Sequence, residues 1–116
     1  MITIPEIFLE KSFLLSSIGV GNLAWKRKDI LNFIKDDCLI EKYILGVDVL
    51  EIINNIDIQH TYDSFSIDRI DSENYFDFIV RSKLECEIFI LNYNENNRNI
   101  IYALILSEPI PVDLDI

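Results

Sequence analysis

One histidine and two aspartates are the side chains of this 116-residue chain that come nearest to a catalytic set. His60 is the only histidine, with Asp48 before it and Asp63 after it in sequence. Two carboxylates could hold a metal ion or act as acid and base, but no third ligand stands at a suitable spacing. A catalytic histidine needs an orienting partner and a nucleophile, and the nearby Ser64 and Ser66 belong to no G-x-S-x-G motif. We therefore expect His60 to be an ordinary side chain on a strand.

Motifs for phosphate, nucleotide or zinc binding are also missing from the sequence. It contains no P-loop and no dinucleotide fingerprint. Cys38 and Cys86 stand far apart and in no zinc-binding spacing, so we expect small buried side chains in a reducing compartment. A disulfide between them is left open. We predict no enzymatic activity, no catalytic residue, no metal site and no cofactor; the opposing hypothesis is a small hydrolase that uses His60 and the nearby acids.

The strongest chemical signal is negative charge. The chain carries 20 acidic and 10 basic residues, which gives a net charge of −10. Such a chain repels nucleic acid and anionic membranes, and it attracts basic proteins. Between residues 48 and 77 there are eight acids and a single base, so this acidic window holds most of the excess charge. A basic protein partner is therefore expected, with no nucleic acid and no membrane.

Aromatic residues alternate with the carboxylates of the acidic window. This composition is expected of an interface that attracts a partner by charge and anchors it by apolar contact. The alternative is a solvated acidic face without a partner. The residues that we predict to bind the partner are Asp48, Asp57, Tyr62, Asp63, Phe65, Asp68 and Asp71.

Two helices are predicted in the N-terminal part of the chain. The first spans residues 3–16, with Thr3 as its cap, and the second spans residues 26–37. Gly19 marks a turn between them, and Trp25 is expected to be a buried anchor at the start of the second helix rather than an exposed contact. The charges at both ends of the second helix oppose its dipole, so we expect tertiary packing to hold it.

A β-hairpin should carry most of the acidic window. Strands are predicted over residues 43–53 and 57–67, because both are rich in β-branched and aromatic residues. The Asn54-Asn55 pair between them is a turn signal. A symmetric hairpin would place Asp48 opposite Tyr62, with Asp63 beside it.

The C-terminal part of the chain is predicted to form a long helix and a final strand. The helix begins at Asp71-Ser72, with Ser72 as its cap, and continues to about residue 94. Its expected buried stripe is Tyr75, Ile79, Cys86, Phe89, Ile90 and Tyr93. The strand over residues 99–107 is apolar on both faces, so we expect it inside the sheet.

The predicted fold is a single α+β domain over residues 1–116. Its core covers about residues 4–107 and is followed by an extended tail, 108–116. A mostly antiparallel sheet of three or four strands should pack against helices on one face. The sequence shows no signal peptide and no apolar run long enough for a bilayer, so we expect a cytoplasmic protein.

Three segments of the chain resemble the immunity protein 40 family of bacterial polymorphic toxin systems. The run from Ser17 to Lys26, followed by Asp29, resembles the family's "siGv…laW…d" segment. Residues 44–49, with Gly46, resemble its "iLGGDV" strand, and residues 61–68 resemble its "tyDnWyid" strand. Val47 stands where the family motif has a second glycine, and Phe65 where it has a tryptophan.

The resemblance implies that the protein protects its producer by binding a toxin encoded nearby. We expect neutralisation by stoichiometric binding through an acidic surface; a basic nuclease would be blocked by occupation of its phosphate-binding groove. The motif residues Gly19, Trp25 and Gly46 are expected to define the fold. The alternative is a non-enzymatic scaffold or adaptor that associates with itself through an exposed sheet edge, and a homodimer is left open.

Overall fold

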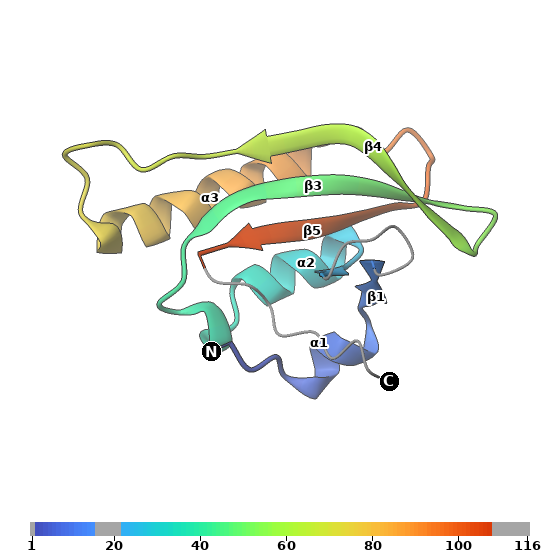
Figure 1. Cartoon of the computed structure of the whole chain (residues 1–116), viewed down its shortest axis with the longest axis horizontal. Helices are drawn as coiled ribbons and strands as arrows, with labels where there is room; N and C mark the ends of the chain where they lie inside the picture. The colour runs from blue at the N-terminus through green and yellow to red at the C-terminus, as the bar shows by residue number, and fades with distance from the viewer. Residues whose placement is uncertain (1, 16–21, 108–116) are drawn as a thin grey trace.

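A computed structural model of the chain describes residues 2–15 and 22–107 (Figure 1). Along the chain lie α1 (Glu6–Glu10), β1 (Phe13–Leu14), β2 (Leu23–Ala24), α2 (Arg27–Ile34), the short 3-10 helix η2 (Asp37–Leu39), β3 (Ile44–Ile53), β4 (Asp57–Ser66), α3 (Tyr75–Asn92) and β5 (Ile100–Leu106). Three antiparallel strands form a sheet in the order β4-β3-β5, and β1 pairs with β2 separately. The predicted α+β domain with a small antiparallel sheet is confirmed. Gly19 and the predicted tail lie outside the described residues.

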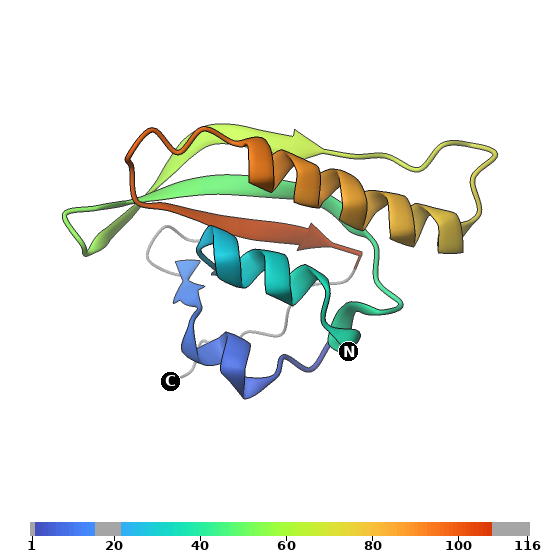
Figure 2. The ribbon, with the colours of Figure 1, turned by 180° about the vertical axis from the view of Figure 1, so that it is seen from behind.

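Helices α2 and α3 cover one face of the three-stranded sheet (Figure 2). Val47, Val49, Tyr102 and Leu104 belong to the larger core cluster on this face, together with residues of both helices. A smaller cluster lies on the other face, where the side chains of Leu50, Ile52, Ile101 and Ala103 meet those of Leu15 and Ala24. The sheet thus has apolar side chains on both faces, and the β1–β2 pair covers part of the face that the long helices leave open.

The β3–β4 hairpin begins as predicted and then departs from the symmetric register. Asn54 and Asn55 form the turn with φ angles of 53° and 62°, which asparagine tolerates better than most residues. Pairing follows the expected register as far as Leu50 opposite His60. A bulge then shifts it, so that Asp48 lies opposite Ser64. The predicted pairing of Asp48 with Tyr62 is wrong, because residues 61–63 of β4 lie against Val49 alone.

Strand β5 is an edge of the three-stranded sheet, and β3 is its centre. The prediction that β5 lies inside the sheet is therefore wrong. Its outer edge is met by Trp25, whose backbone N–H and C=O bond those of Tyr102 at 2.9 and 2.7 Å. Strand β5 is apolar on both faces because each face packs against one of the two core clusters.

Helix α1 is much shorter than the predicted helix over residues 3–16. It follows Pro5, has no side-chain cap and contains no buried residue, so Thr3 is not its cap. An isolated helix of this length gains little stability of its own. After it, Phe13 and Leu14 pair with Ala24 and Leu23 in extended conformation, which ends the helical pattern.

The N-cap of helix α3 lies two residues later than the sequence pattern indicates. Asn74 is its N-cap and accepts a hydrogen bond from the backbone N–H of Asp77 at 2.8 Å, so the prediction of Ser72 as the cap is wrong. The buried residues of α3 are Phe78, Ser82, Cys86 and Ile90, each one turn beyond the last. Of the stripe that the sequence predicts to be buried, Cys86 and Ile90 are buried, whereas Tyr75 is 57% exposed.

Gly46 allows close contact between the two strands of the hairpin. A Cβ atom at this position would lie 2.5 Å from the backbone oxygen of Phe65. Backbone atoms cannot withdraw as a flexible side chain can, so any larger residue would push β3 and β4 apart. The glycine is required by sheet geometry.

Candidate partner-binding surface

A β-bulge that is held by several hydrogen bonds exposes Tyr62 at the middle of β4. Tyr62 has a φ of 66° and is 87% exposed, an unusual state for a large aromatic residue. Thr61 holds one side of the bulge, because its Oγ1 donates to the carbonyl of Val49 at 2.7 Å and accepts from the N–H of Asp63 at 3.0 Å. On the other side the N–H of Tyr62 donates to Nδ1 of His60 at 2.8 Å. These contacts fix the bulge and the position of the tyrosine.

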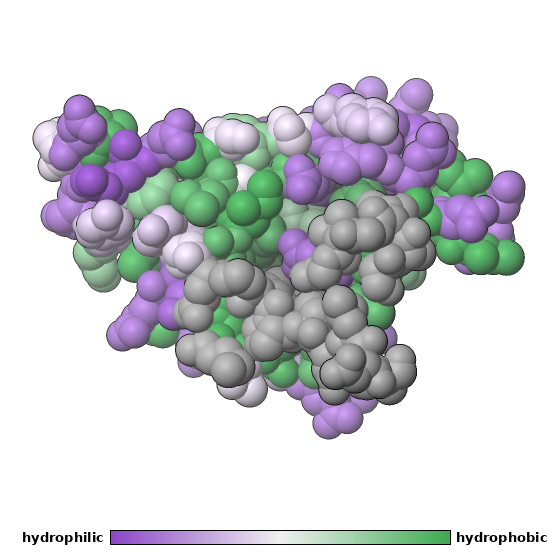
Figure 3. Space-filling model, in the orientation of Figure 1, coloured by the Kyte–Doolittle hydropathy of each residue, from purple (hydrophilic) through white to green (hydrophobic). Residues whose placement is uncertain are grey.

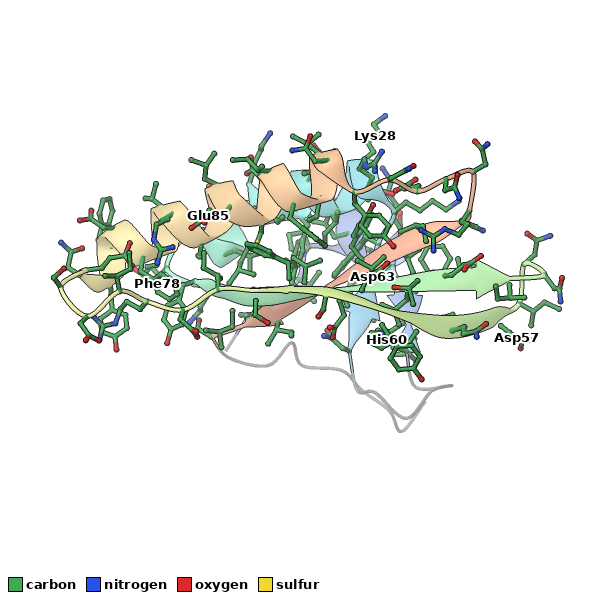
Figure 4. The ribbon with its side chains drawn as sticks, turned by 90° about the horizontal axis from the view of Figure 1, so that it is seen from above. Lys28, Asp57, His60, Asp63, Phe78 and Glu85 are labelled. Carbon is green, nitrogen blue, oxygen red and sulfur yellow. The ribbon has the colours of Figure 1, made fainter. Side chains whose placement is uncertain are left out.

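His60 helps to stabilise the bulge through contacts with Tyr62. Its ring stacks on the Tyr62 ring, with centroids 5.1 Å apart. Because Nδ1 accepts a hydrogen bond, the neutral ring carries its proton on Nε2. Nε2 lies 4.0 Å from Oδ1 of Asp48 on the neighbouring strand. Figure 4 shows His60 on the sheet face opposite the long helices, and its contact with Asp48 places that carboxylate on the same face.

Asp63 lies on the other side of the bulge, toward α3 (Figure 4). Its Oδ2 accepts a hydrogen bond from the hydroxyl of Tyr93 at 2.6 Å. Arg98 donates to the same hydroxyl at 3.1 Å, which orders the tyrosine from its other side. Asp63 is exposed in spite of these contacts. Asp48 and Asp63 thus lie on different faces of the sheet. The two carboxylates do not form one site.

Phe65 packs between β4 and α3. Its ring stacks on that of Phe89 with centroids 5.1 Å apart and an interplanar angle of 18°, and the side chain is half-buried. Of the seven residues predicted to bind a partner, Phe65 is the one whose main contacts belong to the core.

The remaining predicted acids lie at the two ends of β4. Asp57 is exposed beside the hairpin turn, and Asp68 and Asp71 are exposed in the loop before α3. Figure 3 shows hydrophilic side chains over this loop, a mixture of hydrophilic and apolar side chains at the hairpin turn, and apolar surface between the loop and the hairpin. The acidic window is therefore spread along the length of β4, with Tyr62 near its middle.

The loop before α3 is held by Arg81. Its guanidinium pairs with Glu73 at 2.7 Å and Glu85 at 2.6 Å, and donates to the carbonyl of Asp68 at 2.8 Å. The bonds from Arg81 lower the pKa of Glu73 below its usual value. Asp68 is thus displayed on an ordered loop.

Arg27 is a structural residue that the sequence pattern does not identify. Its Nε and Nη2 donate to the carbonyls of Ile90 and Tyr93 at the C-terminal end of α3, at 3.1 and 2.5 Å. It also pairs with Glu95 at 3.5 Å, and Glu95 accepts from the hydroxyl of Tyr102 at 2.7 Å. The cation that opposes the dipole of α2 therefore stabilises the end of α3. The unfavourable charge at the start of α2 was the signal for such a contact.

With this geometry in view, the comparisons with known proteins identify the family. The model of the family described as immunity protein 40 matches residues 14–106 of the chain. The chain belongs to the immunity protein 40 family. No curated protein and no solved structure matches it. Family membership implies an immunity function in a toxin system, with a toxin protein as the partner, and proteins of this kind are generally not enzymes.

Residues 2–15 and 22–107 hold no group of three or more His, Cys, Asp or Glu side chains that could bind a metal ion. Over the same ranges, no helix has the length and apolar character needed to cross a membrane. Cys38 and Cys86 are free thiols, and burial raises the pKa of each to about 12.

Proposed function

We propose that this family member neutralises a basic protein toxin by one-to-one binding, and that Tyr62 and its neighbours make the contact. We call Asp48, His60, Tyr62 and Asp63 the bulge surface. The observation that carries the proposal is that an 87% exposed tyrosine is held in a left-handed backbone conformation by hydrogen bonds on both sides. Strained residues held in place by their surroundings are typical of functional sites.

Tyrosine is well suited to be the central contact of such an interface. It buries a large area on binding while losing few rotatable bonds, and tyrosines are enriched among the residues that dominate binding energy. The bulge and the stacked His60 ring restrict Tyr62 before the partner arrives. Less conformational entropy is then lost on association.

The acids around Tyr62 favour a basic partner. Asp48 and Asp63 flank it, and Asp57, Asp68 and Asp71 extend the negative charge along β4. Complementary charge raises association rates and disfavours the wrong partners. If the toxin is a nuclease, this surface would occupy the groove that otherwise binds phosphates. On this proposal the protein acts in the cytoplasm, without catalysis and without a cofactor.

Co-expression with the toxin encoded next to this gene tests the proposal. We expect survival and a complex that co-purifies at a one-to-one ratio. Tyr62→Gly should weaken binding by about 10- to 100-fold, the effect of losing a dominant contact. The free protein should stay as stable or become more stable, because glycine adopts a positive φ without strain.

Ile56→Ala is the matched control. Ile56 is 81% exposed on the same hairpin but lies at its turn, so the toxin complex should be unaffected. Absence of rescue and of any complex with the wild-type protein would exclude neutralisation by binding. An unchanged affinity after Tyr62→Gly would show that the toxin uses another surface.

The alternative, a scaffold that pairs through its sheet edge, receives less support. Among the described strands, β4 is the edge of the three-stranded sheet that pairs on one side only, and the bulge interrupts its ladder at residues 61–63. Bulges on edge strands work against pairing with another chain. Self-association through this edge is therefore the weaker hypothesis.

A further inference from the structure

Helix α3 carries a second apolar stripe on the side that faces solvent. The stripe consists of Phe76, Val80, Leu84, Ile88 and Leu91, and we call it the α3 stripe. These side chains are between 49% and 73% exposed and recur every three or four residues, so they line one side of the helix. Figure 2 shows none of the described helices or strands in front of α3, and Figure 4 shows side chains projecting from it away from the sheet.

The opposite side of the same helix already forms part of the core. Phe78, Ser82, Cys86 and Ile90 are its buried residues. A helix that is apolar on both sides is ordinarily covered on both sides. A contiguous row of five exposed apolar side chains marks an interaction surface more often than a solvated face.

We propose that the α3 stripe is covered by a second copy of this chain, which packs its own α3 antiparallel against it. The charge on α3 favours this occupant. Arg81 and Lys83 balance all but one of the three acids Asp77, Glu85 and Glu87, whereas the acidic window has eight acids and one base. The acidic window reaches α3 only at Asp77, in its first turn, so antiparallel packing keeps the two windows at opposite ends of the contact. A strongly basic partner is better matched by the bulge surface.

The spacing of the α3 stripe is also self-complementary. Residues four apart form a ridge that fits the groove between the corresponding ridges of another helix. With the twofold axis at Leu84, Val80 lies beside the partner's Ile88, and Arg81 comes near the partner's Glu85. The contact is isologous and closes at two copies. Complete burial of the five side chains would supply on the order of 500 Å² per copy, which brings the total to the lower limit of roughly 1,000 Å² for a specific interface.

This dimer leaves the surface around His60 free. His60 and Asp48 lie on the face of the sheet opposite α3, so each copy could still bind a toxin. The inference is independent of the proposed function, because it concerns another partner and side chains of α3 that are not part of the bulge surface, of which only Asp63 faces toward α3.

Sedimentation velocity and light scattering on the full chain test the inference. The wild-type protein should have twice the chain mass of 13.6 kDa. Leu84→Glu should have the mass of one chain, because two carboxylates would meet at the twofold axis. Ile56→Glu adds the same charge at an exposed apolar residue away from α3, and it should remain a dimer. Circular dichroism and thermal unfolding should show that both variants are folded.

Leu84→Cys gives a second test, which does not depend on losing an interaction. Mild oxidation should join two copies through position 84, whereas the wild-type protein and Ile56→Cys should stay uncrosslinked under the same conditions. A wild-type protein that is monomeric at every concentration, or a Leu84→Glu variant that remains dimeric, would overturn the inference. A monomeric wild type whose toxin binding is lost in Leu84→Glu would also overturn it, because the α3 stripe would then belong to the toxin. Loss of toxin binding in Tyr62→Gly, without such a loss in Leu84→Glu, is compatible with the proposed dimer.

Discussion

Trp25 joins three parts of the fold through a single residue. Its side chain is fully buried, its ring lies 4.5 Å from that of Phe33 in α2, and its Nε1 donates to the carbonyl of Phe8 at 2.7 Å. Its backbone also bonds that of Tyr102 in β5. The predicted burial of Trp25 is confirmed, and its contacts explain why a tryptophan suits this position.

Replacement of Trp25 should therefore cost much of the stability of the fold. Trp25→Ala should lower the free energy of unfolding by about 3–5 kcal/mol, through lost packing and a cavity. Trp25→Phe should cost less, because it keeps a ring against Phe33 while losing the bond to Phe8. Urea unfolding measures both. Equal stability of Trp25→Ala and the wild type would contradict the structural role.

At the scale of single residues, the sequence identifies positions that depend on local preference and misses those that depend on distant partners. The Asn54-Asn55 turn follows from the tolerance of asparagine for left-handed angles. Among the proposed contact residues, the exposure of Tyr62 depends on the bulge, and the packing of Phe65 depends on Phe89 in α3. Neither the bulge nor the contact with Phe89 can be inferred from the residues that surround Tyr62 and Phe65 in the sequence.

At the scale of elements, Arg27 ties the start of α2 to the end of α3. The last carbonyls of a helix have no partner within it, and two of those at the end of α3 accept from this guanidinium. Its two donor nitrogens reach both carbonyls at once, while its charge faces Glu95. A single ammonium group cannot reproduce that arrangement.

Arg27→Lys should accordingly destabilise the protein although it keeps the charge. We expect a loss of about 1–3 kcal/mol in the free energy of unfolding, because partly buried carbonyls lose their donors. Lys28→Ala, at the exposed neighbouring position, should change stability by less than about 0.5 kcal/mol. Denaturant unfolding compares the two. Equal stability of Arg27→Lys and the wild type would show that charge alone suffices.

The loop before α3 should respond to acid through Glu73. The N–H of Ile70 donates to Oε1 of Glu73 at 3.2 Å, and the hydrogen bonds from Arg81 hold the pKa of this carboxyl below its usual value. A carboxyl whose pKa is lowered by folding stabilises the folded state above its unfolded pKa and loses that effect as the pH falls. The structure of the loop should therefore persist at neutral pH and weaken in acid.

The amide NMR signal of Ile70 should report this transition. Its chemical shift should titrate with a midpoint lower than that of an unpaired glutamate, because the carboxylate that it contacts is stabilised by Arg81. Arg81→Gln should move the midpoint upward, and Glu73→Gln should abolish the titration. A wild-type midpoint equal to or above that of an unpaired glutamate in a short peptide would contradict the pairing of Glu73 with Arg81.

Helices and strands were predicted correctly where their own sequence pattern determines their range. The prediction failed where contacts with another element determine where a helix ends or where a strand lies. The hairpin strands and α2 match their predicted ranges within a few residues. The predicted first helix is cut short because Phe13 and Leu14 pair with β2. The position of β5 at an edge depends on Trp25 and on β3, which lie far away in sequence.

At the scale of the whole molecule, the negative charge along β4 and most of the α3 stripe lie on different elements. The excess acids follow β4 from the hairpin turn to the loop before α3, and the α3 stripe lies on a helix of nearly balanced charge. Charge acts over a distance near the Debye length and so governs encounter, whereas apolar contact acts only after docking. The net charge was evident from the sequence, but its separation from the α3 stripe required the fold.

The rate of toxin association should therefore depend on salt. We expect it to fall by about tenfold or more between low and high ionic strength, because screening removes the attraction of a basic toxin to the acidic window. Asp57→Lys with Asp68→Lys should reduce both the rate and its salt dependence, without the structural cost of changing Asp63, which accepts from Tyr93. Glu10→Lys with Glu41→Lys changes the net charge equally at exposed positions outside β4, and should have a smaller effect. Stopped-flow fluorescence measures these rates, and a rate that is independent of salt would show that charge does not guide the encounter.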